Sequence, residues 1–350
     1  MTGVLEEEEP TMREADLLDS GRREFLTRAS TLAAACLLSH PDRSVAAEPP
    51  PETTHVRLVH LPFICLAPQY PAEEFLPLEG FTTWDYLPLG TRSGVDALAE
   101  GRADISMWSA PELLLRLDAG QPIVVLAGVH GGCYQLFGGD RVHSIRDLRE
   151  RTVAIHYFGS GDHVLLSTML AYVGINPQEV NWVTGQDIGN AMNLFIEGKA
   201  DAFCGFAQEP AELRARKIGR VIVDTAQDKP WSQYFCCLVA ANRDFAERNP
   251  VATKRVLRAI LKAADICAAD PERVARFLFE KLYEPRYPIG LEVIKGTQFS
   301  RWREASPEDT LRFFALRLHE VGMLKSTPDR LIAKGTDWRF LNELKRELKA

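Results

Sequence analysis

The feature that most constrains the fold is an internal duplication with an offset of 97 residues. Residues 100–120 and 197–219 both read Glu-Gly-basic-Ala-Asp, followed by an apolar strand pattern, a proline-containing loop and an amphipathic helical pattern that ends in glycine. The same offset carries the apolar segment that begins at Val56 onto the one that begins at Val153. Two copies of one unit predict two lobes of similar construction.

Each copy also contains a second strand and helix pattern, and a closing strand follows at residues 122–129 and 220–226. The predicted order in each half is therefore β-α-β-α-β-α-β. Apolar strands that alternate with amphipathic helices are typical of parallel-rich sheets flanked by helices. We therefore expect an α/β fold in which two lobes face each other through the loops at the carboxyl ends of their strands, where such sheets bind ligands.

The chain is predicted to cross between the lobes twice, at the polar segments 138–144 and 226–233, which contain Gly or Pro and are suited to hinges. The boundaries follow from these crossings: lobe 1 comprises residues 55–138 and 234–350, and lobe 2 comprises residues 145–225.

The last third of the chain is predicted to be helical after a strand at residues 235–245 that returns to lobe 1. Asn249 is the expected N-cap of the first long helix and Pro250 its first residue. We expect this helical extension to pack on lobe 1.

The first 47 residues have the order of a secretory signal peptide, which here resembles the twin-arginine type. Arg22 and Arg23 precede an apolar run at 29–38, and small residues stand before Glu48. The alternative is a disordered tail with a chance arginine pair. Cys36 is a candidate for lipid attachment, and residues 48–54 are read as a linker. The expected location is the periplasm.

Beyond residue 47 the chain has 39 acidic and 36 basic residues, a net charge of −3. This balance gives no support to a nucleic-acid partner. The spacings of the six remaining cysteines match no zinc pattern, and we expect most of them to be buried thiols. No cofactor or metal is expected, no hydrolase motif is present, and the chain is expected to be a monomer.

The turn at Gly159, Ser160 and Gly161 joins an apolar strand to a helix, so it places bare N–H groups at a helix N-terminus. A dinucleotide loop is one interpretation, but Val164 stands where the third glycine belongs. A tight turn that uses glycine for backbone freedom is another. The interpretation we favour is a ligand cradle in which Ser160 and the helix N-terminus donate hydrogen bonds.

Other candidate ligand-binding residues lie at predicted strand ends or beside a crossing, and each could instead be a core or capping residue: Phe63, Trp108, Ser109, Tyr134, Phe206, Gln208 and Glu209. These side chains offer aromatic rings, an amide and a carboxylate, but no arginine or lysine. A nitrate or sulfonate site would need a cationic or strongly donating environment. The set therefore favours a neutral or amine-bearing planar ligand, such as a pyrimidine-like compound.

The segments 67–81, 100–106, 117–138, 144–155, 172–180 and 249–265, taken in order, resemble solute-binding proteins of ABC importers. The resemblance is to the nitrate/sulfonate/taurine group, which also includes proteins similar to a pyrimidine-precursor synthase. It implies a two-lobed periplasmic-binding-protein fold of type 2, a closing cleft, and delivery of a small molecule to a membrane permease and its ATPase, without catalysis. The cysteine-rich segment that marks the synthases is represented only by the isolated Cys133.

Two other functions stay open. One is an enzyme of the pyrimidine-synthase type, which an export signal argues against. The other is a binder of an anion such as nitrate, a sulfonate or taurine, or a sensor that reports its ligand to a membrane receptor.

Overall fold

The computed structural model describes residues 48–60, 63–88, 94–185 and 190–349. The chain divides into two units, residues 1–49 and 50–350, and every element below lies in the second. The predicted signal peptide and Cys36 lie outside the described residues. No helix among the described residues is long and apolar enough to span a membrane.

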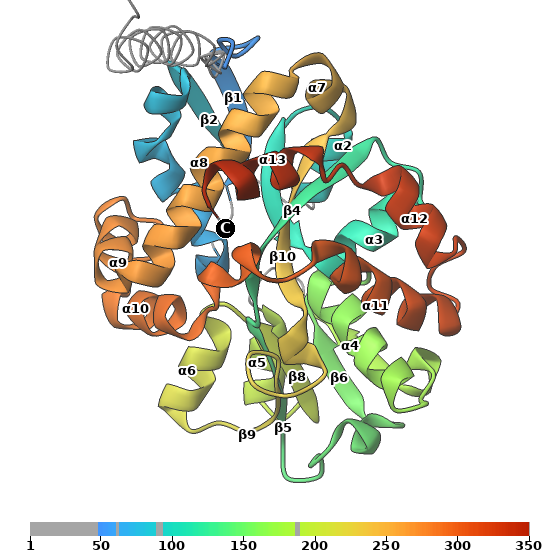
Figure 1. Cartoon of the computed structure of the whole chain (residues 1–350). Coiled ribbons are helices and arrows are strands. Elements are labelled where there is room, and N and C mark those ends of the chain that lie inside the picture. The colour runs from blue at the N-terminus through green and yellow to red at the C-terminus, as the bar shows by residue number, and fades with distance from the viewer. Residues whose placement is uncertain (1–47, 61–62, 89–93, 186–189, 350) are drawn as a thin grey trace, which may run out of the picture. The chain divides into compact units, whose positions relative to one another are not determined.

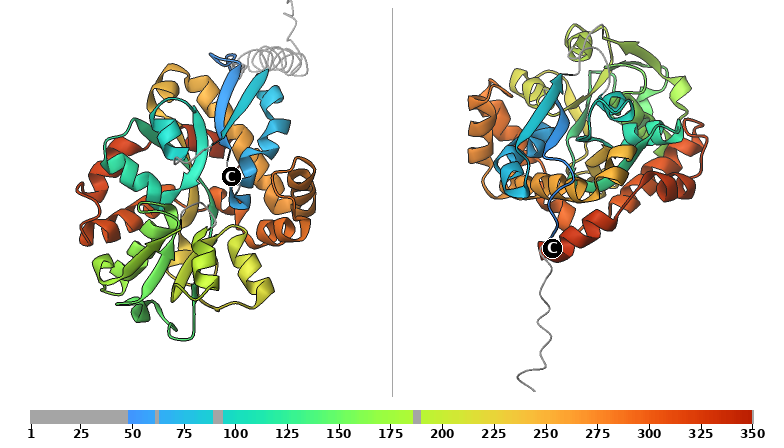
Figure 2. Two further views of the ribbon diagram at one scale, coloured as in Figure 1. Left: turned by 180° about the vertical axis from the view of Figure 1, so that it is seen from behind. Right: turned by 90° about the horizontal axis from the view of Figure 1, so that it is seen from above.

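The second unit contains two lobes, which Figure 1 and the left view of Figure 2 show one above the other. In lobe 1, β1 (His55–His60) pairs in parallel with β2 (Thr83–Pro88), and β10 (Phe235–Asn242) lies antiparallel between β3 (Ile105–Ser109) and β4 (Ile123–Gly131). The helices of this part are α2 (Gly94–Ala99) and α3 (Ala110–Asp118).

Lobe 2 has one five-stranded sheet in the order β7-β6-β8-β5-β9, with bounds β5 (Tyr134–Gly138), β6 (Thr152–Ile155), β7 (Asn181–Thr184), β8 (Ala202–Phe206) and β9 (Arg220–Asp224). The pairs of β6 with β7 and β8 are parallel, whereas β5 runs antiparallel to β8 and β9. Its helices are α4 (Gly161–Tyr172), α5 (Asn190–Ile196) and α6 (Glu209–Arg216). The predicted α/β order is thus confirmed in lobe 2, whose sheet is mixed, and in lobe 1 except for the helix expected between β1 and β2.

The repeated Glu-Gly-basic-Ala-Asp motif has the same structural role in each lobe. Asp104 accepts a hydrogen bond from the backbone N–H of Arg57 in β1 at 2.8 Å, and Asp201 accepts one from Thr152 in β6 at 3.1 Å. The motif glycines have φ of +69° at Gly101 and +72° at Gly198, a region that glycine enters without strain. The motif therefore ends a helix and fastens the following strand to the first strand of its lobe.

Two expectations about lobe 1 need correction. Its first helix is replaced by three short 3₁₀ turns, η1 (Ile64–Gln69), η2 (Pro71–Glu74) and η3 (Leu76–Glu79), because prolines recur every few residues there and interrupt helical hydrogen bonding. The first crossing is also earlier than predicted: β5 already belongs to the sheet of lobe 2, so the chain changes lobes between Gly131 and Tyr134 rather than at 138–144. The second crossing, between Asp224 and Phe235, contains the predicted segment 226–233.

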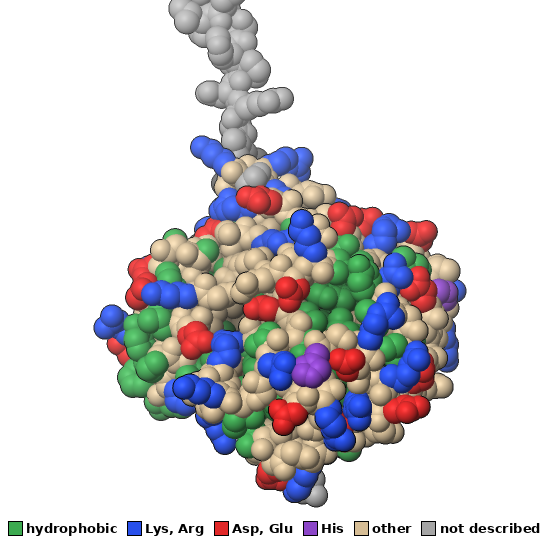
Figure 3. Space-filling model, turned by 90° about the horizontal axis from the view of Figure 1, so that it is seen from below, with side chains coloured by type: hydrophobic (Ala, Val, Ile, Leu, Met, Phe, Trp, Pro, Cys, Tyr) green, Lys and Arg blue, Asp and Glu red, His purple; other side chains and the backbone are tan. Residues whose placement is uncertain are grey.

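The C-terminal helices return to lobe 1 as expected and bury a shared core: α7 (Arg243–Arg248), α8 (Pro250–Ala269), α9 (Pro271–Glu280), α10 (Tyr287–Gly296), α11 (Pro307–Glu320), α12 (Pro328–Gly335) and α13 (Arg339–Glu347). Helix α8 begins at Pro250 with Asn249 at its N-cap position, as predicted, but the Asn249 side chain makes no capping hydrogen bond. The carboxylate of Glu52 instead accepts the N–H groups of Val251 and Ala252, at 3.0 and 2.9 Å. Charges of both signs are interspersed on the face that Figure 3 shows.

Candidate functional site

The loops at the strand ends of the two lobes are in contact. Phe63 of lobe 1 and Phe206 of lobe 2 have ring centroids 4.6 Å apart. Tyr157 of lobe 2 donates a hydrogen bond to the buried carboxylate of Glu112 in lobe 1 at 3.3 Å. The cleft predicted between the lobes is therefore in a closed arrangement in this structure.

Two ion pairs join the lobes at another edge. Arg214 of α6 lies 2.6 Å from Glu292 of α10, and Arg286 of lobe 1 lies 3.1 Å from Glu212 of α6. Each lobe supplies one cation and one anion, so the pairs favour one alignment of α6 against α10. Because all four side chains are partly exposed, each pair contributes at most about 1 kcal/mol.

Phe206 is the centre of an aromatic cluster that includes both lobes. Its ring lies 5.1 Å from the ring of Tyr134 and 5.1 Å from that of His156, besides its contact with Phe63. Phe206 ends β8, Tyr134 begins β5, and His156 follows β6, so three neighbouring strands of the lobe 2 sheet supply these rings. Such planar apolar walls suit a flat ligand.

Beneath Phe206 lies a buried ionic cluster. Nδ1 of His156 is 3.0 Å from Asp162, and Nε2 is 3.0 Å from Glu209. Burial by itself would lower the pKa of His156, but the two carboxylates outweigh it and raise the pKa well above its usual value. Burial would likewise raise the pKa of Asp162, yet His156 and Ser160 hold it below its usual value. The cluster is thus one imidazolium between two carboxylates, with one net negative charge.

The carboxylate of Glu209, predicted to cap a helix or to meet a ligand, is engaged by two other residues of lobe 2. Its Oε1 meets His156, and its Oε2 accepts the backbone N–H of Phe206 at 3.1 Å, just before α6. Gln208 occupies the N-cap position of α6, but its side chain does not cap the helix.

The turn at residues 159–161 uses most of its polar groups internally. Gly159 has φ of +86° and donates its N–H to Nδ1 of His163 at 3.0 Å. The Ser160 hydroxyl hydrogen-bonds with the carbonyl of Tyr157 at 2.6 Å and with the carboxylate of Asp162. The hydroxyl that we predicted would donate to a ligand is therefore engaged within the turn, and a carboxylate lies in the first turn of α4.

Gly161 brings the two lobes close together. A side chain there would lie 2.7 Å from the Ser109 hydroxyl and would also overlap the Tyr134 hydroxyl. Ser109 ends β3 and is buried, and its hydroxyl has no hydrogen-bond partner among the described residues. Trp108 is buried too, with its ring against Gly94. The described contacts of Trp108 are those of a core aromatic.

The two crossings between the lobes are fastened to each other. Tyr134 donates its N–H to the Thr225 hydroxyl at 3.0 Å, and Thr225 donates both its hydroxyl and its N–H to the Tyr134 carbonyl, at 2.8 and 3.0 Å. Gly132 has φ of +48° and packs so closely on Ala226 that a Cβ would overlap its backbone. The crossings therefore form one hinge rather than two independent strands.

Cysteines gather at this hinge. A disulfide joins Cys133 of the first crossing to Cys236 of β10, and Cys237 and His130 are buried beside it. Burial lowers the pKa of His130 to about 4, so its imidazole is neutral at physiological pH. The expectation of buried thiols is confirmed for Cys65, Cys204, Cys237 and Cys267.

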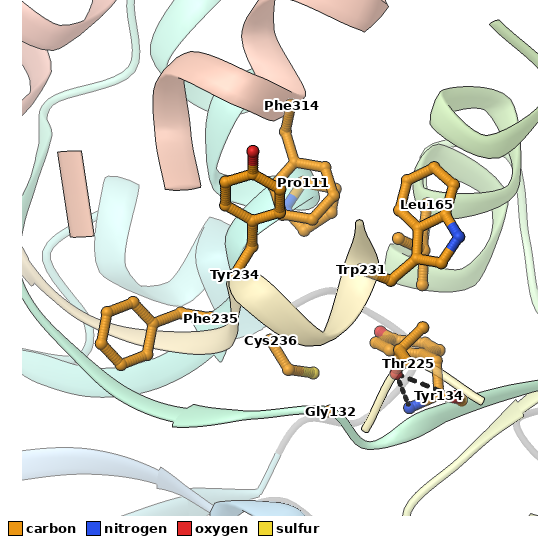
Figure 4. A pocket seen from close by; sticks show the side chains of 10 residues that line it. All are labelled: Pro111, Gly132, Tyr134, Leu165, Thr225, Trp231, Tyr234, Phe235, Cys236 and Phe314. Carbon is orange, nitrogen blue, oxygen red and sulfur yellow. Dashed lines mark hydrogen bonds between the residues drawn. The ribbon is translucent and has the colours of Figure 1, made fainter. Parts of the chain in front are cut away.

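A small apolar cavity of about 20 Å³ lies on one side of this hinge (Figure 4). Its walls include Tyr134, Trp231, Tyr234 and Cys236. On another side, a groove of about 510 Å³ reaches Cys133 and has both polar and apolar walls. The hinge cysteines are thus flanked by space on two sides.

The structure brings many of the predicted residues together. Phe63 meets Phe206, and Ser109 meets Gly161, across the lobes. The remaining ones adjoin these contacts within lobe 2: Tyr134, Gly159, Ser160 and Glu209. Trp108 and Gln208 adjoin them in sequence, and Trp108 belongs to the buried core against which Phe63 and Phe206 pack. Sequence reasoning missed the partners of these residues, above all His156 and Asp162. The signal was a histidine at a strand end followed by an acidic residue in the first turn of the next helix.

The amino-acid sequence matches a known protein family. The NMT1/THI5-like family model matches residues 86–274, more than half of the chain. In Saccharomyces cerevisiae the protein named 4-amino-5-hydroxymethyl-2-methylpyrimidine phosphate synthase THI5 is 25% identical over 199 residues, which cover 53% of this chain. The chain spans 57% of the length of that relative.

Solved structures show the same fold at low identity. The periplasmic nitrate-binding protein NrtA from Synechocystis PCC 6803 superposes with a TM-score of 0.71 and 17% identity, covering 86% of this chain and 90% of its own. The periplasmic aliphatic sulphonate-binding protein SsuA from Escherichia coli has a TM-score of 0.61 and 18% identity, with coverages of 83% and 92%. The predicted periplasmic-binding-protein fold is therefore confirmed.

Proposed function

The chain belongs to the NMT1/THI5-like family, and from this premise we propose that it is the extracytoplasmic solute-binding protein of an ABC importer. It captures a small molecule between its lobes and delivers it unchanged to a permease that an ATPase drives. The observation that carries this proposal is the meeting of strand-end loops from both lobes around Phe206. A guest held there is released when the hinge opens.

The charges around the cleft support a neutral or amine-bearing planar ligand. Three buried carboxylates line this region, on Glu112, Asp162 and Glu209, and the imidazolium of His156 is already shared by two of them. An anion such as nitrate would meet net negative charge, whereas a ligand with N–H donors would not. The rings of Phe63 and Phe206 supply apolar faces for a planar ring.

A thermal-shift screen of the purified protein tests this proposal. Pyrimidines, aromatic amines, nitrate, taurine and alkanesulfonates are added singly, and a ligand at 100 times its Kd adds about 2.7 kcal/mol to the free energy of unfolding. We expect a planar N–H donor to stabilise the chain and the Phe206→Leu variant to lose at least about tenfold in affinity, or 1.4 kcal/mol. The matched control is Phe279→Leu, at an exposed ring on α9. Stabilisation by anions alone would contradict the ligand class.

A second function has one observation in its favour, the 25% identity to proteins named as pyrimidine phosphate synthases. Mass spectrometry separates the two functions. Ligand and protein are recovered after prolonged incubation, and the proposal expects both masses to be unchanged. A new small-molecule product, or a lasting loss of mass from the chain, would instead identify an enzyme.

A further inference from the structure

Four side chains at the hinge form a set of soft and borderline metal ligands. The side-chain nitrogens of His130 and the sulfurs of Cys133, Cys236 and Cys237 each offer one ligand atom, and these atoms lie within 4.8 Å of one another. One histidine with three cysteines is a common ligand set of structural zinc sites. The set was invisible to a search by spacing because its two pairs lie about a hundred residues apart.

The sheet itself explains how the four side chains meet. His130 stands directly opposite Cys237 in the antiparallel pairing of β4 with β10, where facing side chains are neighbours. The register shifts between Phe235 and Cys237, and such a bulge turns a side chain away from strict alternation. The sulfurs of the consecutive Cys236 and Cys237 therefore lie on one side, 3.7 Å apart.

The first crossing supplies the fourth ligand. Gly132 adopts φ of +48° immediately after β4, and this sharp turn brings Cys133 back toward β10, within bonding distance of Cys236. The Nε2 atom of the fully buried His130 has no hydrogen-bond partner among the described residues. A buried nitrogen without a partner is costly unless something binds it.

We propose that His130, Cys133, Cys236 and Cys237 form a tetrahedral site for Zn²⁺ that is available when the Cys133–Cys236 disulfide is reduced. In the oxidised chain two of the ligands are consumed by the disulfide. Reduction by a dithiol adds two electrons and two protons to the sulfurs, and the dithiol leaves as its own disulfide. Zn²⁺ then binds the thiolates and the neutral imidazole, and the displaced thiol protons pass to solvent.

The dimensions fit this ion. With Zn–S bonds of about 2.3 Å and a Zn–N bond of about 2.0 Å, tetrahedral ligand atoms are roughly 3.5–3.8 Å apart. The spread of up to 4.8 Å therefore needs contraction of only about 1 Å at its widest. The groove at Cys133 gives an entry path, because this cysteine is the one member of the set that is only half-buried.

Zn²⁺ bound here would link both crossings, as the disulfide does. Cys133 belongs to the segment that enters lobe 2, whereas Cys236 and Cys237 begin the strand that leaves it. The hinge would thus be cross-linked in either redox state, by a covalent bond or by the metal. This inference does not depend on which solute occupies the cleft.

The test uses the purified chain, reduced with excess dithiol that is then removed under argon. Co²⁺ is added as a spectroscopic probe, followed by competition with Zn²⁺ in the presence of a chromogenic chelator. We expect one ion per reduced chain, a near-ultraviolet thiolate-to-cobalt charge-transfer band of the intensity given by three thiolates, and displacement of Co²⁺ by Zn²⁺. The oxidised chain should bind neither ion at this site.

Variants assign the ligands. Cys237→Ala and His130→Gln should each weaken Zn²⁺ binding by about 100-fold or more, since replacing even a residue that only hydrogen-bonds to a metal ligand lowers metal affinity about 10–100-fold. Cys267→Ala, which removes a buried thiol from α8, is the matched control and should bind as the wild type does. Absence of stoichiometric binding, a band from fewer than three thiolates, or full affinity in Cys237→Ala would each overturn the site. The wild-type band decides the matter even if a variant fails to fold.

Discussion

The ionic cluster under Phe206 supports a quantitative prediction, because the His156 imidazolium is the cation that lies between two buried carboxylates. The substitution His156→Gln keeps a similar volume but removes the charge. A glutamine amide can donate to one carboxylate, whereas its oxygen would face the other. Asp162 and Glu209 would then be left as buried anions without a counter-charge, a loss that typically costs 3–5 kcal/mol.

This cost converts into a measurable change of melting temperature. Unfolding entropy is about 2.1 cal/mol/K per residue, or roughly 0.6 kcal/mol/K for a body of about 300 residues. A loss of 3–5 kcal/mol therefore lowers Tm by about 5–8 °C at pH 7. Differential scanning calorimetry gives the value directly, with urea titration as a second measurement.

The control is His163→Gln on α4. That histidine is similarly buried, but its Nδ1 accepts only the N–H of Gly159, so its loss should cost about 1 kcal/mol. The reasoning is refuted if His156→Gln melts within about 2 °C of the wild type, or if both variants lose the same stability.

Two further predictions rest on single contacts, and a third rests on the ionic cluster. Gly161→Ala places a methyl group against the lobe 1 hydroxyl, so ligand-induced compaction in solution scattering should be lost while the fold remains. Gly132→Ala forces a Cβ into the backbone of Ala226, and calorimetry should show a fall in Tm of several degrees, whereas Gly174→Ala, with open space around it, should cost less. The pKa of His156 is raised by folding, so its contribution to the free energy of unfolding is complete below about pH 6.5 and is lost as the pH rises through the folded-state pKa. The pKa of Asp162 is lowered by folding, so its contribution is complete above about pH 3.9 and is lost as the pH falls through the folded-state pKa. Urea titrations should therefore find that the joint contribution of His156 and Asp162 to the free energy of unfolding is constant between about pH 4 and 6.5.

The element order could be predicted because it rests on local patterns. The duplicated motif is recognisable in the sequence because Asp104 and Asp201 have the same role, each accepting a backbone N–H from the first strand of its lobe. The first crossing could not be placed, because Tyr134–Gly138 continues an apolar run that Gly132 and Cys133 barely interrupt. Its assignment to lobe 2 depends on pairing with β8 and β9, which lie far along the chain.

The sequence predicts where the residues of the candidate site lie, but not which residues they contact. Strand ends identify Phe206 and Glu209, since carboxyl ends of neighbouring strands share one edge of a sheet. Nothing in the sequence indicates that Glu209 meets His156, 53 residues away, rather than a ligand. A spacing search for metal ligands fails for the same reason at the hinge, where a sheet register and a bulge make the set.

These partnerships narrow what can set ligand specificity. In lobe 2 the polar groups that the sequence offered to a ligand are largely matched with one another: His156 with two carboxylates, and Ser160 with Asp162 and a carbonyl. In lobe 1 the buried Ser109 hydroxyl faces Gly161 and has no partner among the described residues. We therefore propose that, toward a ligand, lobe 1 supplies a directional hydrogen bond and lobe 2 chiefly an aromatic face and a negative field. A ligand that satisfies both is a flat ring with an acceptor on one edge and N–H donors on another, which a simple oxyanion is not.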